Sequence, residues 1–173
     1  MVKKELLELN DIIKNELDSK QSSLLLQWVN TWNMYIKNES SFKPHLNRKY
    51  NKKEIITVAL GYNVGSEQGG NRPAVVIEDN DRSNKTVTIV PLASIDKASE
   101  PLNKASVFLG EIPQLNVKTR KPIGTSSKAL VGQIRTVSKQ RIIRPKKNKD
   151  DVIEITDTQL ELIKNKIKEL YID

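Results

Sequence analysis

The chain has 173 residues, of which 37% are hydrophobic, and it carries a net charge of +8. This length suits one domain of ordinary size with room for an appendage. No apolar run approaches the roughly 20 residues that span a bilayer, no signal-peptide pattern opens the chain, and the absence of cysteine excludes disulfides, so we expect a soluble, cytoplasmic protein.

The first 50 residues are expected to form a helical extension. Apolar residues recur at helical spacing over residues 2–17, and a second stripe contains Leu25, Trp28, Val29, Trp32 and Ile36. Ser22 or Ser23 is the expected N-cap of the second helix, and the short polar turn predicts a helical hairpin. Tryptophans at this spacing more often belong to a core than to a ligand platform. Because residues 37–52 have the composition of a linker, we predict two domains, 1–50 and 51–173.

From residue 53 onward the pattern changes to short segments rich in β-branched residues. They predict strands over residues 54–60, 73–77, 86–92, 105–108, 129–137 and 141–144. Residues 113–127 are long and polar and carry Lys118, Arg120 and Lys121, so we expect a mobile binding loop there. A helix over residues 157–170 closes the pattern, with Thr156 and Gln159 at capping-box spacing.

A glycine-rich polar loop precedes the second predicted strand. Gly65, Gly69 and Gly70 can adopt a positive φ, which allows the chain to fold back tightly. The loop ends in Arg72, and the following Pro73 favours an extended backbone at the arginine. Such an arrangement suits a guanidinium that must meet a phosphate. A hairpin loop with a solvated arginine has the same pattern, so the spacing alone leaves both interpretations open.

The positive charge is concentrated in one part of the chain. Residues 51–145 carry 15 basic and 8 acidic side chains, whereas residues 1–50 have a net charge of +2 and residues 146–173 of −1. This distribution indicates a polyanionic partner or a generally basic soluble protein. His45 is the only histidine and is expected at the surface, which excludes a two-histidine ribonuclease mechanism. No His, Asp or Glu cluster has metal-ligand spacing, so we expect neither a metal nor a cofactor.

Four ordered blocks resemble the MazF/PemK family of toxin ribonucleases. The first block (VGSEQGG) covers residues 64–70 and continues, after one variable residue, into Arg72 and Pro73. The others are VTIVPLAS at residues 87–94, QIRTV at 133–137 and SKQRI at 138–142. The resemblance covers roughly residues 50–172 and leaves the N-terminal extension outside it.

This resemblance implies an α+β fold, a small SH3-like antiparallel β-barrel (the PemK/CcdB-like toxin fold) with a C-terminal helix. It also implies a sequence-specific, metal-independent endoribonuclease, an mRNA interferase toxin that cleaves single-stranded RNA with the RNA's own 2′-hydroxyl as nucleophile. The implied partners are a second copy of the chain, in a homodimer whose RNA groove spans the interface, and a peptide antitoxin that folds on binding.

The family's site residues carry over onto matching positions of this sequence. Arg72 aligns with a catalytic arginine and Ser94 with a catalytic threonine, so we expect Arg72 to stabilise the phosphorane and Ser94 to hydrogen-bond the scissile phosphate. Glu67 is expected to contact a base, to orient Arg72 or to accept hydrogen bonds within the loop. With the basic residues of the 113–127 loop included, the expected RNA-binding residues are Ser66, Glu67, Gln68, Lys118, Arg120, Lys121, Ser127 and Gln133.

The sequence departs from the family pattern at three places. Gly132 stands where many members have an acidic residue, Lys53-Glu54 replaces a Gly-Asp pair, and Ser138 replaces a frequent aspartate. These departures keep open a second interpretation, a non-catalytic module that binds nucleic acid or a protein target such as gyrase. The extension has three open roles: a regulator packed across the groove, part of a dimer interface, or a surface for another protein.

Overall fold

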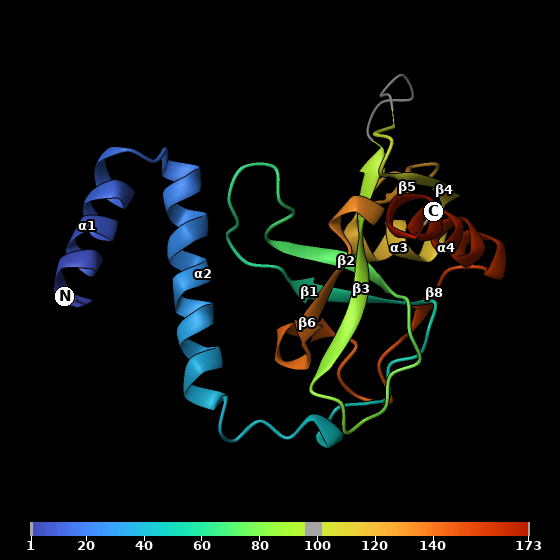
Figure 1. Cartoon of the computed structure of the whole chain (residues 1–173), viewed down its shortest axis with the longest axis horizontal. Coiled ribbons are helices and arrows are strands. Elements are labelled where there is room, and N and C mark those ends of the chain that lie inside the picture. The colour runs from blue at the N-terminus through green and yellow to red at the C-terminus, as the bar shows by residue number, and fades with distance from the viewer. Residues whose placement is uncertain (1, 96–101, 173) are drawn as a thin grey trace.

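The computed structural model describes residues 2–95 and 102–172 (Figure 1). Its described helices are α1 (Val2–Asn15), α2 (Ser19–Asn38), α3 (Pro113–Thr119) and α4 (Asp157–Tyr171). Its described strands are β1 (Glu54–Ala59), β2 (Asn71–Val76), β3 (Thr86–Ile95), β4 (Val107–Glu111), β5 (Ser126–Ala129), β6 (Arg135–Ser138), β7 (Ile142–Arg144) and β8 (Ile153–Glu154). Among these elements, no helix is long and apolar enough to cross a membrane.

The eight described strands form one sheet with antiparallel pairing throughout. The main path runs β4-β5-β3-β2-β1-β7, while β6 pairs with β3 and β8 with β1. The two ends of this path, β4 and β7, do not pair with each other, so the described strands do not close the small antiparallel β-barrel that the sequence predicts. Helices α3 and α4 contribute to the core on one face, which buries apolar side chains there without closure.

The predicted strand over residues 129–137 is wrong as a single element. It consists of β5 and β6, separated by a 3₁₀ turn (Val131–Gln133) in which Val131 is buried. Both strands pair with β3, Leu92 with Ala129 and Ile89 with Arg135. Between these pairs the chain has five residues, 130–134, where β3 has two, and the surplus residues form the turn.

Residues 113–127 do not form the mobile polar loop that the sequence predicts. Pro113 begins helix α3, in a position where its missing N–H needs no partner. Leu115 is buried in the core beside the sheet. The helix ends at Arg120, whose φ of 56° closes the last turn in the left-handed conformation. One apolar anchor and a proline start are thus enough to make this polar segment helical.

The sheet has apolar side chains on both faces. One cluster, completed by α3 and α4, includes Ile55, Val75, Val90 and Leu92, and the other includes Tyr50, Ile56, Val76 and Ile89. Because successive strand residues point to opposite faces, the central stretches of β1 and β2 have apolar residues in succession, for example Ile55-Ile56 and residues 74–76. In β2, residues 74–76 are buried whereas Asn71 and Arg72 are exposed. The core therefore fixes the second half of β2 and leaves its first residues at the surface.

Helix α4 confirms its predicted position and cap. The Thr156 hydroxyl accepts a hydrogen bond from the Gln159 backbone N–H at 3.2 Å, and the Gln159 side chain accepts one from the Thr156 N–H at 2.8 Å. The Gln159 amide also donates to the Leu109 carbonyl at 2.6 Å. The cap therefore ties the helix start to strand β4 as well as to itself.

The N-terminal segment forms two helices, α1 and α2, whose side chains are all at least partly exposed. The predicted N-cap is wrong, because Asp18 caps α2 and accepts from the Gln21 N–H at 2.7 Å. Ser22 instead donates its hydroxyl to the Ile13 carbonyl of α1 at 2.8 Å. Trp32 is 52% exposed, so the predicted core role is wrong for this tryptophan. The apolar stripes of these helices thus lie largely outside the core.

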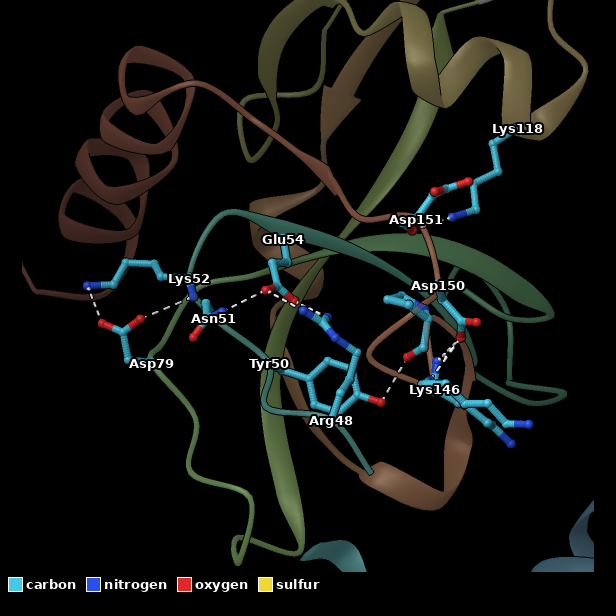
Figure 2. A network of polar contacts seen from close by, with 12 residues as sticks. Arg48, Tyr50, Asn51, Lys52, Glu54, Asp79, Lys118, Lys146, Asp150 and Asp151 are labelled. Atoms are coloured by element: carbon cyan, nitrogen blue, oxygen red, sulfur yellow. Dashed lines mark hydrogen bonds and ion pairs between the residues drawn. The ribbon is translucent and has the colours of Figure 1, made fainter. Parts of the chain in front are cut away.

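The segment just before β1 packs into the sheet (Figure 2). Tyr50 is fully buried and donates a hydrogen bond from its hydroxyl to the Pro145 carbonyl at 3.0 Å. Arg48 and Glu54 form an ion pair in which Arg48 Nη2 lies 2.9 Å from Glu54 Oε1. Asn51 donates to the same carboxylate oxygen at 2.8 Å. A buried ring and a nearly buried charge pair therefore join this segment to the sheet.

Tyr50 makes the stability of the fold sensitive to alkaline pH. Burial raises the pKa of Tyr50 to about 12, whereas an unfolded tyrosine ionises near pH 10. Between these values the folded state holds a proton that the unfolded state has lost, so the free energy of unfolding falls as the pH rises, by about 3 kcal/mol in total. Urea titrations from about pH 9 to about pH 12 should show this fall in the wild type and a shallower one in Tyr50→Phe. Equal slopes in the wild type and in Tyr50→Phe would contradict the assignment.

Candidate active site

The loop between β1 and β2, residues 60–70, is a closed hairpin. The Leu60 N–H donates to the Gly70 carbonyl at 2.8 Å, and the Gly70 N–H donates to the Gly61 carbonyl at 2.7 Å. Gly65 and Gly70 have positive φ values of 59° and 71°, as their role in a tight loop requires. Gly69 differs, because a Cβ at this position would lie 2.7 Å from the Gly61 carbonyl oxygen. It is therefore close backbone packing, rather than an unusual φ, that requires glycine at residue 69.

Alanine substitutions should separate these two reasons for glycine. Gly69→Ala forces backbone apart and is expected to lower the free energy of unfolding by about 2 kcal/mol. Gly65→Ala meets no atom within 4 Å and has only the left-handed φ to accommodate, which costs about 1 kcal/mol. Urea denaturation of both variants would measure the difference. A larger loss for Gly65→Ala than for Gly69→Ala would contradict the close-packing explanation.

Arg72 stands at the exposed start of β2, directly after this loop. It pairs with Val58 of β1, and its Nε donates to the Gly69 carbonyl at 3.0 Å. No described residue gives its two terminal nitrogens a hydrogen bond or an ion pair. The loop therefore holds one edge of the guanidinium and leaves the other N–H donors available to an anion.

The guanidinium borders a cavity of about 570 Å³, called here the Arg72 cavity. Its walls are Leu24, Gln27, Trp28 and Thr31 from α2, and Ala59, Gly61, Tyr62, Asn63, Glu67, Gly69, Gly70, Asn71 and Arg72 from the β1–β2 hairpin. Glu67 supplies the acidic side chain of this lining, and it is exposed and without a hydrogen-bond or ion-pair partner among the described residues. The exposed Arg72 guanidinium and the unpaired Glu67 carboxylate thus line the same cavity.

Gln133, predicted to bind RNA, forms hydrogen bonds with the backbone of the β1–β2 loop. Its Oε1 accepts from the Gln68 N–H at 3.3 Å and from Arg135 Nη2 at 3.0 Å. Its Nε2 donates to the Ser66 carbonyl at 3.4 Å. The structure therefore brings three predicted site residues, Ser66, Gln68 and Gln133, into one network that shapes the loop. Their contact with RNA stays a prediction.

Ser94 and Ser127 form a second group of predicted site residues. They face each other across the β3–β5 pair, and Ser127 is only 3% exposed. By strand alternation Ser94 continues the row of Val90 and Leu92, whereas Arg72 continues the row of Ala74 on the opposite face of the sheet. Ser94 does not line the Arg72 cavity. Its role at the scissile phosphate therefore stays a prediction.

The basic residues of the α3 region lie beside a smaller groove. This groove, of about 150 Å³, is lined by Ile55, Thr57, Asn71, Pro73, Leu115, Lys118, Thr119, Arg144 and Ile153. Lys118 Nζ lies 3.4 Å from the Asp151 carbonyl, whereas Arg120 and Lys121 follow at the exposed end of α3. Asn71 lines both the groove and the Arg72 cavity. Arg144, which the sequence did not single out, joins Lys118 as a positive charge at this groove.

Gly132, where an acidic residue was expected, has a packing explanation. A Cβ at this position would lie 2.8 Å from the Ala105 Cβ, and the Gly132 N–H donates to the Ala105 carbonyl at 2.9 Å. Any side chain here would force the two segments apart. His45 is exposed in a 3₁₀ turn (Pro44–Leu46), as expected. Over residues 2–95 and 102–172, no group of three or more His, Cys, Asp or Glu side chains has the geometry of a metal site.

The sequence left open that the extension packs across the groove, but it did not single out the face of α2 that lines the cavity. Leu24, Gln27, Trp28 and Thr31 have the i, i+3, i+4, i+7 spacing of one helix face. Two of the four are polar, so an apolar-stripe search finds only part of this face. The spacing was a usable signal, but nothing in it indicated what the face would contact.

Comparisons with known proteins identify the family. A MazF from Deinococcus radiodurans has a TM-score of 0.50 at 18% identity, covering 72% of this chain and 97% of that chain, which shows a shared fold. An endoribonuclease from Mycobacterial species, solved with its cognate antitoxin, has a TM-score of 0.46 at 16% identity over 69% of this chain and 91% of that one. No curated protein sequence matches significantly. The model of the PemK-like, MazF-like toxins of type II toxin-antitoxin systems matches residues 51–171, and the chain therefore belongs to that family.

Proposed function

We propose that this chain is a sequence-specific, metal-independent endoribonuclease that cleaves single-stranded RNA, the toxin of a toxin-antitoxin pair. The observation that carries the proposal is the exposed fork of Arg72, held by Gly69 at the edge of a cavity that Glu67 also lines. Membership of the toxin family and the excess of basic residues over positions 51–145 support it.

The reaction is a transesterification within the RNA. The 2′-oxygen attacks the adjacent phosphorus, the bond to the 5′-oxygen breaks, and the products are a 2′,3′-cyclic phosphate and a 5′-hydroxyl. A guanidinium has N–H donors and no acceptor, so the N–H groups of Arg72 stabilise the negative charge on the phosphorane rather than act as a base. In this proposal Glu67, which lines the cavity, accepts the 2′ proton, and a water molecule donates a proton to the leaving 5′-oxygen.

The remaining charges suit an extended RNA strand. Asn71 lies between the Arg72 cavity and the groove that contains Lys118 and Arg144. A strand that crosses Asn71 would place its scissile phosphate at Arg72 and a neighbouring phosphate near the two other cations. Such contacts make binding depend on ionic strength, because each neutralised phosphate releases condensed counterions.

Two protein partners belong to the proposal. A type II toxin has a protein antitoxin, and an acidic peptide that folds on binding is the chemistry that this basic surface would accept. A homodimer is the expected assembly of the toxin itself. Light scattering of the purified chain, alone and with the protein encoded beside it, would measure both.

The test is incubation of the purified full chain with a long single-stranded RNA in EDTA, beside the Arg72→Ala variant. The proposal predicts cleavage at a few short motifs by the wild type alone, with cyclic-phosphate and 5′-hydroxyl ends. Intact RNA in both reactions would overturn it. Equal cleavage by both proteins would show that the activity does not depend on Arg72.

A further inference from the structure

Helix α2 lies outside the family match and yet forms one side of the Arg72 cavity. The toxin model matches residues 51–171, whereas Leu24, Gln27, Trp28 and Thr31 of α2 line the cavity opposite the β1–β2 hairpin. All four project from one helix face. In Figure 1, α2 stands beside the loop that connects β1 to β2. The extension therefore adds a wall to a site whose other wall belongs to the toxin domain.

Specific contacts hold α2 in this position. The Trp28 ring lies so close to Gly61 that a Cβ there would be 2.8 Å from two of its ring atoms. The Arg141 guanidinium stands over the same ring, 5.2 Å from its centroid, and donates from Nη1 to the Leu60 carbonyl at 3.2 Å. Within α2 itself, the Tyr35 ring makes an edge-on contact with the Trp28 ring, with the two centroids 6.2 Å apart. The Trp28 ring thus connects α2 to the start of the β1–β2 loop, directly at Gly61 and through Arg141 at Leu60.

The wall offers the groups that recognise a nucleobase. The Gln27 side chain is exposed and has no hydrogen-bond partner among the described residues, so its amide presents both a donor and an acceptor. Leu24 and Trp28 on either side supply apolar surface against which a base can pack. An unpaired base of single-stranded RNA is recognised through its polar edge and its flat face together.

Size and charge agree with one nucleotide as occupant. The cavity of about 570 Å³ lies within the range of roughly 300–1,000 Å³ that is common for small-molecule sites. The α2 wall contributes no charge, while Arg72 and Glu67 stand on the facing wall. Arg72 is exposed, so α2 flanks the guanidinium without covering it. A helix that served to block the site would have to hide this side chain.

We propose that α2 is the base-recognition wall of the RNA site, and that Gln27 selects the nucleotide next to the scissile phosphate. This inference rests on the proposed function, which supplies the phosphate at Arg72. It assigns the extension a direct part in substrate choice. The family domain would then provide the chemistry and the extension part of the specificity.

Gln27→Ala tests the inference, with Asn33→Ala on the opposite, exposed face of α2 as control. Alanine is a strong helix former, and no described side chain depends on the Gln27 amide, so the fold should persist. We expect Gln27→Ala to lower kcat/KM by roughly 5- to 10-fold, as for one lost hydrogen bond, and to relax the base preference at one position beside the cut. Asn33→Ala should keep the wild-type rate and motif. Identical cut sites and rates for both variants would overturn the inference while leaving the proposed function intact.

A binding measurement separates this inference from the proposed function. The chain has two tryptophans, and Trp32→Phe leaves Trp28, in the cavity wall, as the only tryptophan, which can be excited selectively over tyrosine. We expect a mixed-sequence oligodeoxynucleotide, which lacks the 2′-hydroxyl, to change Trp28 fluorescence, and Gln27→Ala in the same background to weaken this binding several-fold. If the oligonucleotide leaves Trp28 fluorescence unchanged, α2 is not the base-recognition wall, even if the wild type cleaves RNA. A fluorescence change without cleavage by the wild type would support the wall and reject the ribonuclease.

Discussion

Replacing Arg72 with lysine is expected to lower kcat for RNA cleavage by roughly 10²- to 10³-fold, the range found when one transition-state donor is lost. Lysine keeps the positive charge and so tests whether charge alone is sufficient. The native guanidinium donates from Nε to the Gly69 carbonyl while its terminal nitrogens remain available. An ammonium cannot occupy both positions, because its donors radiate from one nitrogen. Arg72→Ala, which removes the charge as well, should lose roughly 10³- to 10⁵-fold.

Single-turnover cleavage of a short RNA that contains the mapped motif would measure this effect. Arg82→Lys is the matched control, because Arg82 is exposed in the turn that follows the other end of β2. We expect this control to cleave at the wild-type rate. Comparable activity of Arg72→Lys and the wild type would mean that the planar arrangement of the guanidinium N–H groups has no role, and that Arg72 contributes only its positive charge.

The part of the site that follows local backbone rules could be predicted from the sequence. Gly65 and Gly70 have the positive φ that a tight polar loop requires, and Arg72 lies at the mouth of a buried strand. These features depend on residues close together in the chain, so their signal is local. Gly69 was placed in the right loop, but the carbonyl that excludes its Cβ belongs to the facing side of the hairpin. The turn propensity of glycine therefore could not show why residue 69 has to be glycine.

Features that depend on distant contacts could not be predicted. Ser94 matches a catalytic position, yet only the register of β3 against its neighbours assigns its side chain to a face. The α2 wall exists because Trp28 meets Gly61 and Arg141, which lie far from it in sequence. Helix α3 has one buried leucine and a proline start in an otherwise polar segment. In each case tertiary packing decides between local alternatives that the sequence leaves nearly equal.

The buried ion pair between Arg48 and Glu54 predicts the largest change in stability. The two side chains are 10% and 2% exposed, and the hydrogen bond from Arg48 to Glu54 raises the pKa of Arg48 above its ordinary value. Arg48→Met would leave the Glu54 carboxylate buried with Asn51 as its remaining side-chain donor. We expect the free energy of unfolding to fall by about 3–5 kcal/mol, because one charge would remain without its counterion. Typical domains have only about 5–15 kcal/mol in total.

A double substitution decides whether this loss comes from the missing attraction or from the orphaned charge. Arg48→Met combined with Glu54→Leu removes both charges and replaces them with apolar groups of similar size, and such exchanges are often neutral or stabilising. We therefore expect the double variant to regain most of the stability that Arg48→Met loses. Lys52→Met is the control, since its pair with Asp79, at 3.3 Å, is largely exposed and should cost less than about 1 kcal/mol. Urea denaturation of the four proteins completes the comparison. A double variant as unstable as Arg48→Met would mean that the attraction itself, and not relief of a buried charge, maintains the fold at the start of β1.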